Sequence, residues 1–250
     1  MRYRTLTGFV LKRAALREAD EVVTFWSWEE GKARVLIRGV KKSTSRLKAA
    51  LTPVSLVCLQ IASSEFMPVV TSARAVKIYS GTLADLPRVA VVFSLFEMVL
   101  RSTADNQANV SVSILLRTSL DYLENSLAVD REFLTAFRLR LLSALGYQPV
   151  SSTCAQCGRK ISAKRPLFWS SIFVGMICGA CSRFDASART LDLPVVSYLD
   201  KLKSESFSFS LLAEAEQTKS QAEQLLIEAF QNICERELNS KNFLAASLAS

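Results

Sequence analysis

The sequence contains no histidine, and this absence removes several kinds of catalytic site at once. Serine–histidine–aspartate triads, cysteine–histidine nucleophile pairs and the two-histidine zinc motifs of hydrolases all need an imidazole. The sequence also carries no P-loop and no glycine-rich dinucleotide-binding fingerprint. We therefore expect a protein that is not an enzyme. Any metal site in it has to be built from thiolates or carboxylates.

Glycine and proline are scarce, with 8 and 6 residues among 250, and half of the residues are hydrophobic. This composition predicts regular structure in one large or two modest domains. The longest apolar stretch, residues 89–100, is shorter than the roughly 20 residues of a membrane-spanning helix, and Glu97 interrupts it. Because the first residues show no apolar segment of a secretory signal, we expect a cytoplasmic protein whose thiols stay reduced.

Excess positive charge is confined to the first third of the chain. The formal net charge is +8, and residues 1–80 alone contain eight more basic than acidic residues. Such an asymmetry indicates a polyanion as the partner of that part.

Residues 1–80 show the pattern of β-strands. Ala33, Val35 and Ile37 alternate with Lys32 and Arg34, which predicts one buried and one basic face. Five such segments in about 80 residues predict a small barrel or sandwich. The predicted strands are residues 5–11, 21–28, 32–38, 55–61 and 69–78.

The pattern changes to helical spacing after residue 80. Asp85 followed by Pro87 is typical of a helix start, and Asp130 and Gly146 are expected to cap and end a later helix. Asp121 and Glu124 lie three residues apart, but without histidine an exposed helix face is favoured over a catalytic pair. The predicted helical segments are residues 90–101, 111–125, 130–145, 194–202 and 211–238.

Four cysteines have the spacing of a metal site. Two residues separate Cys154 from Cys157 and Cys178 from Cys181, and twenty residues lie between the pairs. One tight turn can present both sulfurs of a pair to one ion, and two such turns complete a tetrahedron. Four thiolates leave no open position for water, so we expect one structural zinc ion. An iron–sulfur cluster, a redox pair and unrelated reduced cysteines are the alternatives.

Eight basic residues of the first third are candidate phosphate contacts for a nucleic acid. The alternative is a solvated basic face without specific function. Trp26 and Trp28 could stack on bases, although strand alternation favours a place in the core. The candidate contacts are Lys12, Arg13, Arg34, Arg38, Lys41, Lys42, Arg46 and Lys48.

Several segments, taken in order, resemble the RecO family of bacterial DNA-repair recombination mediators. Gly8-Phe9-Val10-Leu11-Lys12 resembles the start of that family, and Arg38-Gly39-Val40-Lys41-Lys42-Ser43 resembles its basic segment. The approach to the cysteines, Phe137-Arg138-Leu139-Arg140-Leu141-Leu142 with Leu145-Gly146-Tyr147, and the tail around Arg236-Glu237-Leu238 are similar too. The resemblance spans nearly the whole chain.

The resemblance implies an α+β architecture, with an N-terminal OB-fold β-barrel, an α-helical domain and a four-cysteine zinc knuckle. The expected boundaries are residues 1–80 for the barrel, 81–150 and 185–250 for the helical domain, and 151–184 for the knuckle. Members of the family bind single- and double-stranded DNA and anneal complementary strands. With the RecR protein they help load recombinase onto strands coated with single-strand-binding protein, whose C-terminal tail they recognise. These properties imply a nucleoid-associated protein.

Two other functions fit parts of the sequence. A basic barrel with a zinc ribbon also suits an RNA-binding or ribosome-associated protein, which a nucleic-acid competition assay would separate from a DNA-binding one. A zinc-dependent enzyme would need an open coordination position, visible as a nitrogen, oxygen or water ligand in metal spectroscopy.

Overall fold

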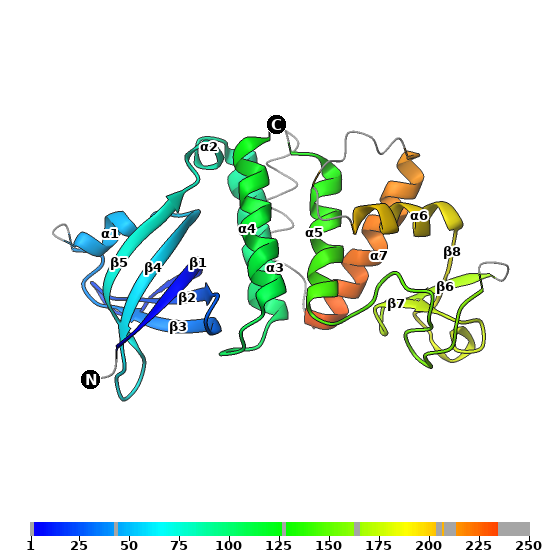
Figure 1. Ribbon diagram of the computed structural model, residues 1–250, viewed down its shortest axis with the longest axis horizontal. Coiled ribbons are helices and arrows are strands. Elements are labelled where there is room, and N and C mark those ends of the chain that lie inside the picture. The colour runs from blue at the N-terminus through cyan, green and yellow to red at the C-terminus, as the bar shows by residue number, and fades with distance from the viewer. Residues whose placement is uncertain are drawn as a thin grey trace. The chain divides into compact units, whose positions relative to one another are not determined.

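The computed structural model describes residues 3–42, 45–126, 129–162, 166–203, 207 and 214–234. The chain divides into two compact units, the first within Met1–Leu127 and the second within Ala128–Leu238. The fold class is α+β, with the strand-rich part first and helices after it (Figure 1). Each unit is described by itself.

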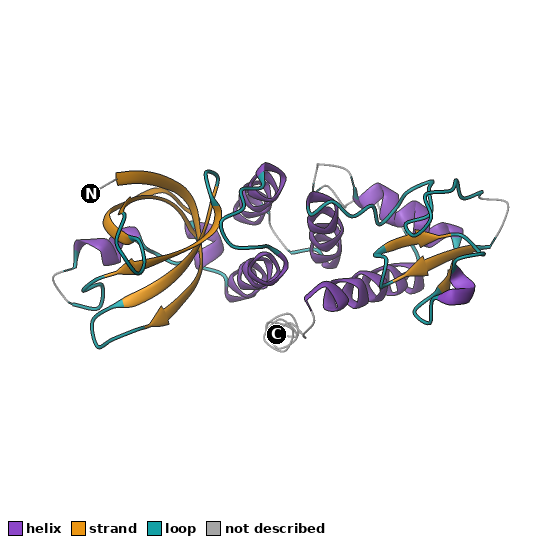
Figure 2. Cartoon of the chain, turned by 90° about the horizontal axis from the view of Figure 1, so that it is seen from below, coloured by secondary structure: helices purple, strands orange, loops and turns teal. Residues whose placement is uncertain are grey.

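The first unit begins with a closed five-stranded barrel in the order β1-β2-β3-β5-β4 (Figures 1 and 2). All paired strands are antiparallel except β3 and β5, which meet in parallel at Leu36 and Val69. This order, with a short helix α1 (Arg46–Ala50) between β3 and β4, is that of an OB-fold. The strands are β1 (Tyr3–Ala15), β2 (Glu21–Ser27), β3 (Gly31–Ile37), β4 (Ser55–Ala62) and β5 (Val69–Ile78).

The long strand β1 closes the barrel because its two halves pair with different neighbours. Its first half pairs with β4 from Tyr3, opposite Ala62, and its second half pairs with β2. Both pairings include Gly8, where a Cβ atom would lie 1.8 Å from the carbonyl oxygen of Trp26. Only glycine permits this approach of the two backbones, so the position fixes the curvature of the strand.

The alternation predicted for the third strand is confirmed. Ala33, Val35 and Ile37 are buried in the barrel core, whereas Arg34 is exposed. The basic segment after this strand has exposed side chains at Arg38, Lys41 and Lys42 but also one buried residue. Val40 is 1% exposed and packs into the barrel core, and the segment ends in α1.

Two long helices pack within the first unit beside the barrel. They are α3 (Leu86–Ser102) and α4 (Val110–Asn125), preceded by the short α2 (Ser80–Leu83). The predicted start of α3 is confirmed, since the carboxylate of Asp85 accepts a hydrogen bond from the Arg88 amide. The buried indole of Trp26 donates a 3.0 Å hydrogen bond to Ser113, which joins β2 to α4.

The second unit contains three helices that pack on one another. They are α5 (Arg131–Ala144), α6 (Leu193–Leu202) and α7 (Glu216–Cys234). Asp130 occupies the N-cap position of α5 without a capping hydrogen bond from its side chain, and Gly146 follows the end of the helix. Glu223 on α7 accepts from Arg131 and lies 3.7 Å from the buried guanidinium of Arg138, both on α5. Residues 211–213 and 235–238 of the predicted last helix lie outside the described residues.

A small antiparallel sheet of order β7-β6-β8 completes the second unit (Figure 2). Its strands are β6 (Leu167–Ser170), β7 (Gly175–Ile177) and β8 (Arg189–Leu191), and the short 3-10 helix η1 (Ser182–Phe184) lies between the last two. β7 leads directly into the second cysteine pair, so the sheet positions half of the candidate metal site.

The two compact units differ from the domain boundaries expected from the sequence. Residues 81–150 and 185–250 were expected to form one helical domain, but α3 and α4 belong to the unit that contains the barrel. The physical reason is the contact of α3 with β1 and the buried bond from Trp26 to Ser113. The predicted boundaries otherwise stay a prediction.

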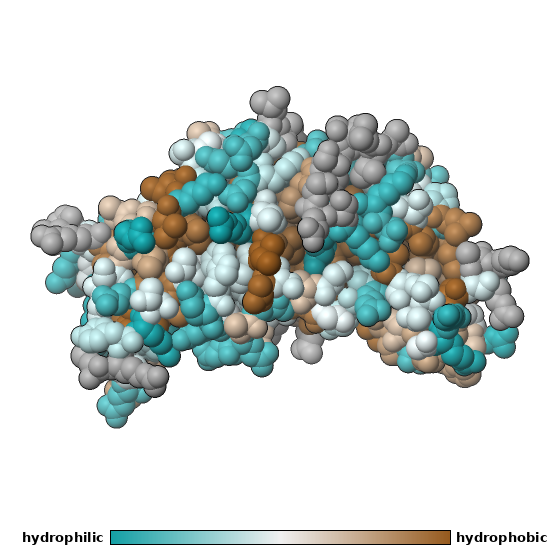
Figure 3. Space-filling view, viewed as in Figure 1, coloured by the Kyte–Doolittle hydropathy of each residue, from teal (hydrophilic) through white to brown (hydrophobic). Residues whose placement is uncertain are grey.

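No helix among the described residues is long and apolar enough to cross a membrane. On the face shown in Figure 3, hydrophobic residues lie in separate patches among hydrophilic ones.

Candidate metal centre and nucleic-acid interface

The first cysteine pair lies on a tight turn closed by backbone hydrogen bonds. The Gly158 amide donates to the Cys154 carbonyl and the Cys154 amide to the Arg159 carbonyl, both at 2.8 Å. Gly158 has φ +70°, a backbone conformation that residues with a Cβ rarely adopt. The turn therefore needs glycine immediately after Cys157.

The second pair follows β7 on a turn of similar construction. The amides of Cys181 and Ser182 both donate to the Cys178 carbonyl at 3.0 Å. The Cys178 amide donates to the sulfur of Cys154 at 3.3 Å, so the backbone of one pair supports a ligand of the other. Gly179, the residue after Cys178, does not have a positive φ, unlike Gly158 after Cys157.

The four sulfurs converge on one point. All Sγ atoms of Cys154, Cys157, Cys178 and Cys181 lie within 4.8 Å of one another, and those of Cys157 and Cys178 are 3.8 Å apart. A tetrahedral zinc ion with Zn–S bonds of about 2.3 Å requires sulfurs roughly 3.8 Å apart. None of the four forms a disulfide. The cluster therefore has the donor set and the size of a closed metal site.

The cysteine cluster packs against apolar residues on one side and contacts a basic side chain on its exposed side. Cys154 and Cys181 pack with the buried Ile177, whereas Cys157 is exposed. Hydrogen bonds from Arg159 lower the pKa of Cys157 to about 6. Arg159 thus favours the thiolate form, which is the form that binds metal.

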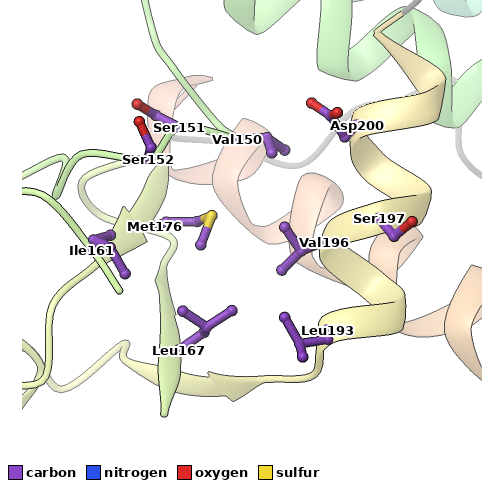
Figure 4. Close-up of a pocket in the computed structure, with 10 residues that line it drawn as sticks. All are labelled: Val150, Ser151, Ser152, Ile161, Leu167, Met176, Leu193, Val196, Ser197 and Asp200. Carbon is purple, nitrogen blue, oxygen red and sulfur yellow. The ribbon is translucent and has the colours of Figure 1, made fainter. Parts of the chain in front are cut away.

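A pocket of about 450 Å³ lies between the small sheet and α6 (Figure 4). Leu167 and Met176 approach it from the sheet, and Leu193 and Val196 approach it from the helix. The charged group among its described lining residues is the carboxylate of Asp200. Its apolar walls and single negative charge do not suit a nucleic acid.

Five of the eight predicted phosphate contacts are exposed cations of the barrel that make no ion pair within the described residues. Three of them, Arg38, Lys41 and Lys42, follow the end of β3 within five residues. Closely spaced free cations are what a phosphate backbone requires. The five are Lys12, Arg38, Lys41, Lys42 and Lys48.

The other three predicted phosphate contacts either form an ion pair or lie outside the described side chains. Arg13 forms a 2.7 Å ion pair with Glu21 and also donates to a backbone carbonyl, so part of its binding capacity is used within the barrel. Arg34 lies 3.8 Å from Asp105, a weaker contact that leaves it largely exposed. The side chain of Arg46 lies outside the described residues. The whole set of eight stays a prediction.

Lys32 has a structural role that the sequence did not reveal. Its ammonium donates to the carbonyls of Leu100 and Thr103 at 2.9 and 2.5 Å and lies 3.2 Å from Asp105. These carbonyls belong to the C-terminal end of α3, where a positive charge is favourable. Lys32 therefore ties β3 to α3, and no local signal separates it from its basic neighbours.

The two acidic residues of α4 also act in packing. Glu124 accepts hydrogen bonds from the amides of Gly81 and Thr82 and from the Thr82 hydroxyl at 2.8–3.0 Å. Burial alone would raise the pKa of Glu124, but these hydrogen bonds hold it below its ordinary value. Asp121 pairs with Lys77 at 2.6 Å. The sequence favoured an exposed helix face for both acids, whereas the structure places each of them in a contact with another element.

Comparison with known families gives a match along nearly the whole chain. Residues 1–79 match the family described as Recombination protein O N terminal, and residues 83–242 match Recombination protein O C terminal.

Curated proteins named DNA repair protein RecO are similar to this chain. The protein of Caldanaerobacter subterraneus is 25% identical over 244 residues, which cover 97% of this chain and 98% of the relative. That of a Roseiflexus species is 29% identical, covering 97% and 84%. That of Frankia casuarinae is 33% identical over 153 residues, covering 60% and 63%.

Proposed function

Because the chain belongs to the RecO family and so has a role in recombinational DNA repair, we propose that it acts by binding DNA and not by covalent catalysis. In this proposal it anneals complementary single strands and helps load recombinase onto strands coated with single-strand-binding protein. Its place is then in the cytoplasm with the nucleoid.

The free cations of the barrel are the observation that carries the proposal. Lys41 and Lys42 follow β3 on the OB-fold, are exposed, and face no acidic partner within the described residues. OB-folds bind single strands along a positively charged groove. Cations that are not already paired in the protein can replace the counterions of phosphates on binding, which is the main source of affinity.

Annealing requires only that two polyanions come close together. A cationic surface reduces the repulsion between the strands, and base pairing supplies the rest of the free energy. No nucleophile, general base or open metal position is needed for this step. The acids that could have suggested catalysis, Asp121 and Glu124, are engaged in packing contacts.

The metal in the four-cysteine site is, in this proposal, one zinc ion. The thiolate set and the spacing of the sulfurs support it. Bound zinc supplies a cross-link between the two turns, and binding on the order of 10 kcal/mol can fold a segment of this size. The four cysteines would hold it without taking part in DNA chemistry.

The protein partners that we propose are those implied by the family. They are the RecR protein and the C-terminal tail of single-strand-binding protein, in addition to single- and double-stranded DNA. The chain's similarity to DNA repair proteins over its full length supports this assignment.

Charge reversal at the barrel tests the proposal. The double variant Lys41→Glu, Lys42→Glu should weaken binding to a labelled single strand and reduce the slope of log affinity against log salt by about 1.4, since each lost phosphate contact contributes about 0.7. Arg74→Glu serves as the control for charge, because Arg74 is an exposed cation on β5 outside the predicted set. Unchanged affinity in the double variant would contradict the proposal. Stronger competition by structured RNA than by DNA would favour an RNA-binding protein.

A further inference from the structure

The knuckle carries a second concave surface, distinct from the apolar pocket of Figure 4. It is a groove of about 990 Å³ that runs beside the second cysteine turn. Arg159, Lys160 and Arg183 line it, and no acidic residue is among its described lining residues. We call it the knuckle groove. Its charge is opposite to that of the pocket at Asp200, so the two surfaces suit different ligands.

An aromatic ring stands exposed in this groove. Phe184, at the end of η1, is 87% exposed, although a phenyl ring of this size is normally buried. Phe168 lies half-buried in the same groove, and beside it Gly179 and Ala180 leave the surface open because their side chains are small. An exposed ring of this kind can serve as a flat stacking platform.

The three basic residues of the groove differ in whether they already contact another group of the protein. Arg159 is engaged in a side-chain hydrogen bond with Cys157. Lys160 and Arg183 are exposed and form no ion pair within the described part of the chain. These two are therefore the groups that remain free to contact an anion.

We propose that the knuckle groove is a second contact site for single-stranded DNA, in which a base stacks on Phe184 while Lys160 and Arg183 hold the adjacent phosphates. Stacking on an exposed ring and neutralisation of phosphates are the two parts of strand binding without sequence preference. The inference rests on the proposed function. The second unit could then hold one strand while the barrel holds another. Annealing requires two strands to be held at the same time.

The geometry favours a nucleic acid over an acidic peptide. An apolar peptide side chain gains its free energy from a pocket that encloses it. Phe184 is 87% exposed, so its ring offers little enclosure to a peptide side chain, whereas a nucleobase needs only the face of a ring. The absence of acidic groups among the described lining residues fits a phosphate backbone.

The test uses the full-length, metal-loaded chain and fluorescence anisotropy with a labelled mixed-sequence single strand and the matching duplex. Phe184→Ala should weaken single-strand binding about 5- to 150-fold, the loss of one stacked base, and should change duplex binding far less. Strand annealing should slow in parallel. Phe173→Ala is the matched control, because Phe173 is also exposed on the second unit but does not line the groove.

The charge part has its own variant. Lys160→Gln with Arg183→Gln should reduce the single-strand salt slope by about 1.4, the value for two phosphate contacts. Lys201→Gln removes one positive charge elsewhere on the second unit, where Lys201 pairs with Glu214, and should leave the slope nearly unchanged.

A third variant covers the case in which Phe184→Ala fails to fold. Phe184→Trp keeps the ring and should retain affinity, and its added emission should be quenched by single strands. Equal single-strand affinity of parent and Phe184→Ala would overturn the proposal. The proposal would also be overturned if Phe184→Ala lost its binding to an acidic, phenylalanine-containing peptide but kept its binding to DNA. If the barrel variant loses affinity while Phe184→Ala does not, the knuckle inference fails and the proposed function stands. If the barrel variant also binds normally, both fail.

Discussion

Replacing Lys32 by methionine should destabilise the first unit by removing the link between β3 and α3. The Lys32 side chain is 12% exposed, and its ammonium makes two hydrogen bonds to carbonyls at the end of α3. Hydrogen bonds from a charged group contribute about 1.5–3 kcal/mol each, and the ion pair to the 45% exposed Asp105 adds at most about 1 kcal/mol. The cost of desolvating the ammonium offsets part of this sum. We expect a net loss of about 2–4 kcal/mol in unfolding free energy.

Urea unfolding followed by tryptophan fluorescence measures this loss. Trp26 and Trp28 report on the first unit, so the measurement is made in a Trp169→Phe background, which removes the signal of the second unit. Methionine keeps the apolar stem of the lysine, so packing changes little. Lys12→Met is the control, since Lys12 is exposed and should shift stability by no more than about 0.5 kcal/mol.

A double-mutant cycle separates the carbonyl contacts of Lys32 from its ion pair. Asp105→Asn alone should cost at most about 1 kcal/mol, and its coupling to Lys32 should be of that size. If Lys32→Met unfolds at the same urea concentration as the parent, the carbonyl bonds do not stabilise the unit and the reasoning is wrong.

Three further predictions follow from described contacts. The purified chain should contain one zinc ion. Removal of this zinc by a strong chelator should make residues 151–184 sensitive to proteolysis. A metal-free chain that stays resistant to the protease would count against a structural metal site. Glu124→Gln should destabilise the first unit near pH 7, because a carboxylate whose pKa is lowered by folding stabilises the folded state at pH values above its ordinary pKa of 4.5. This stabilisation should vanish as the pH falls through the folded-state pKa. If the hydrogen bonds to Thr82 contribute nothing, thermal unfolding will show the same difference between variant and parent at every pH. Glu223→Gln should lower the unfolding free energy by about 3 kcal/mol, because it leaves Arg138 buried without its counter-charge. Adding Arg138→Met should restore much of that stability. Calorimetry that finds the double variant as unstable as the single one would contradict this.

The features that the sequence predicts well depend on neighbouring residues. Alternation in Ala33, Val35 and Ile37 follows from the pleat of a strand, and Asp85 before Pro87 follows from the needs of a helix start. The cysteine pairs are of the same kind, because two residues between thiolates define a turn. These local rules predict the barrel strands, the described helices and the clustering of the four cysteines.

The features that the sequence did not predict depend on contacts between distant segments. Lys32 reaches a carbonyl 68 residues away and Glu124 an amide 42 residues away, and neither partner is visible in the local pattern. The division of the helices between two units has the same origin in the bond from Trp26 to Ser113.

The two pairings of β1 also determine when the barrel can be completed during synthesis. Among the barrel strands β1 leaves the ribosome first, but the partner of Tyr3 is Ala62 on β4, and the last seam, between Leu36 and Val69, needs β5. At about 5–20 residues per second, roughly 2–9 s separate the appearance of Ala15 at the end of β1 from that of Ala62 at the end of β4. During this interval β1 can form a hairpin with β2 while its other edge stays open. β1, the first of the barrel strands to be made, therefore keeps one edge open to wrong pairing until β4 follows it.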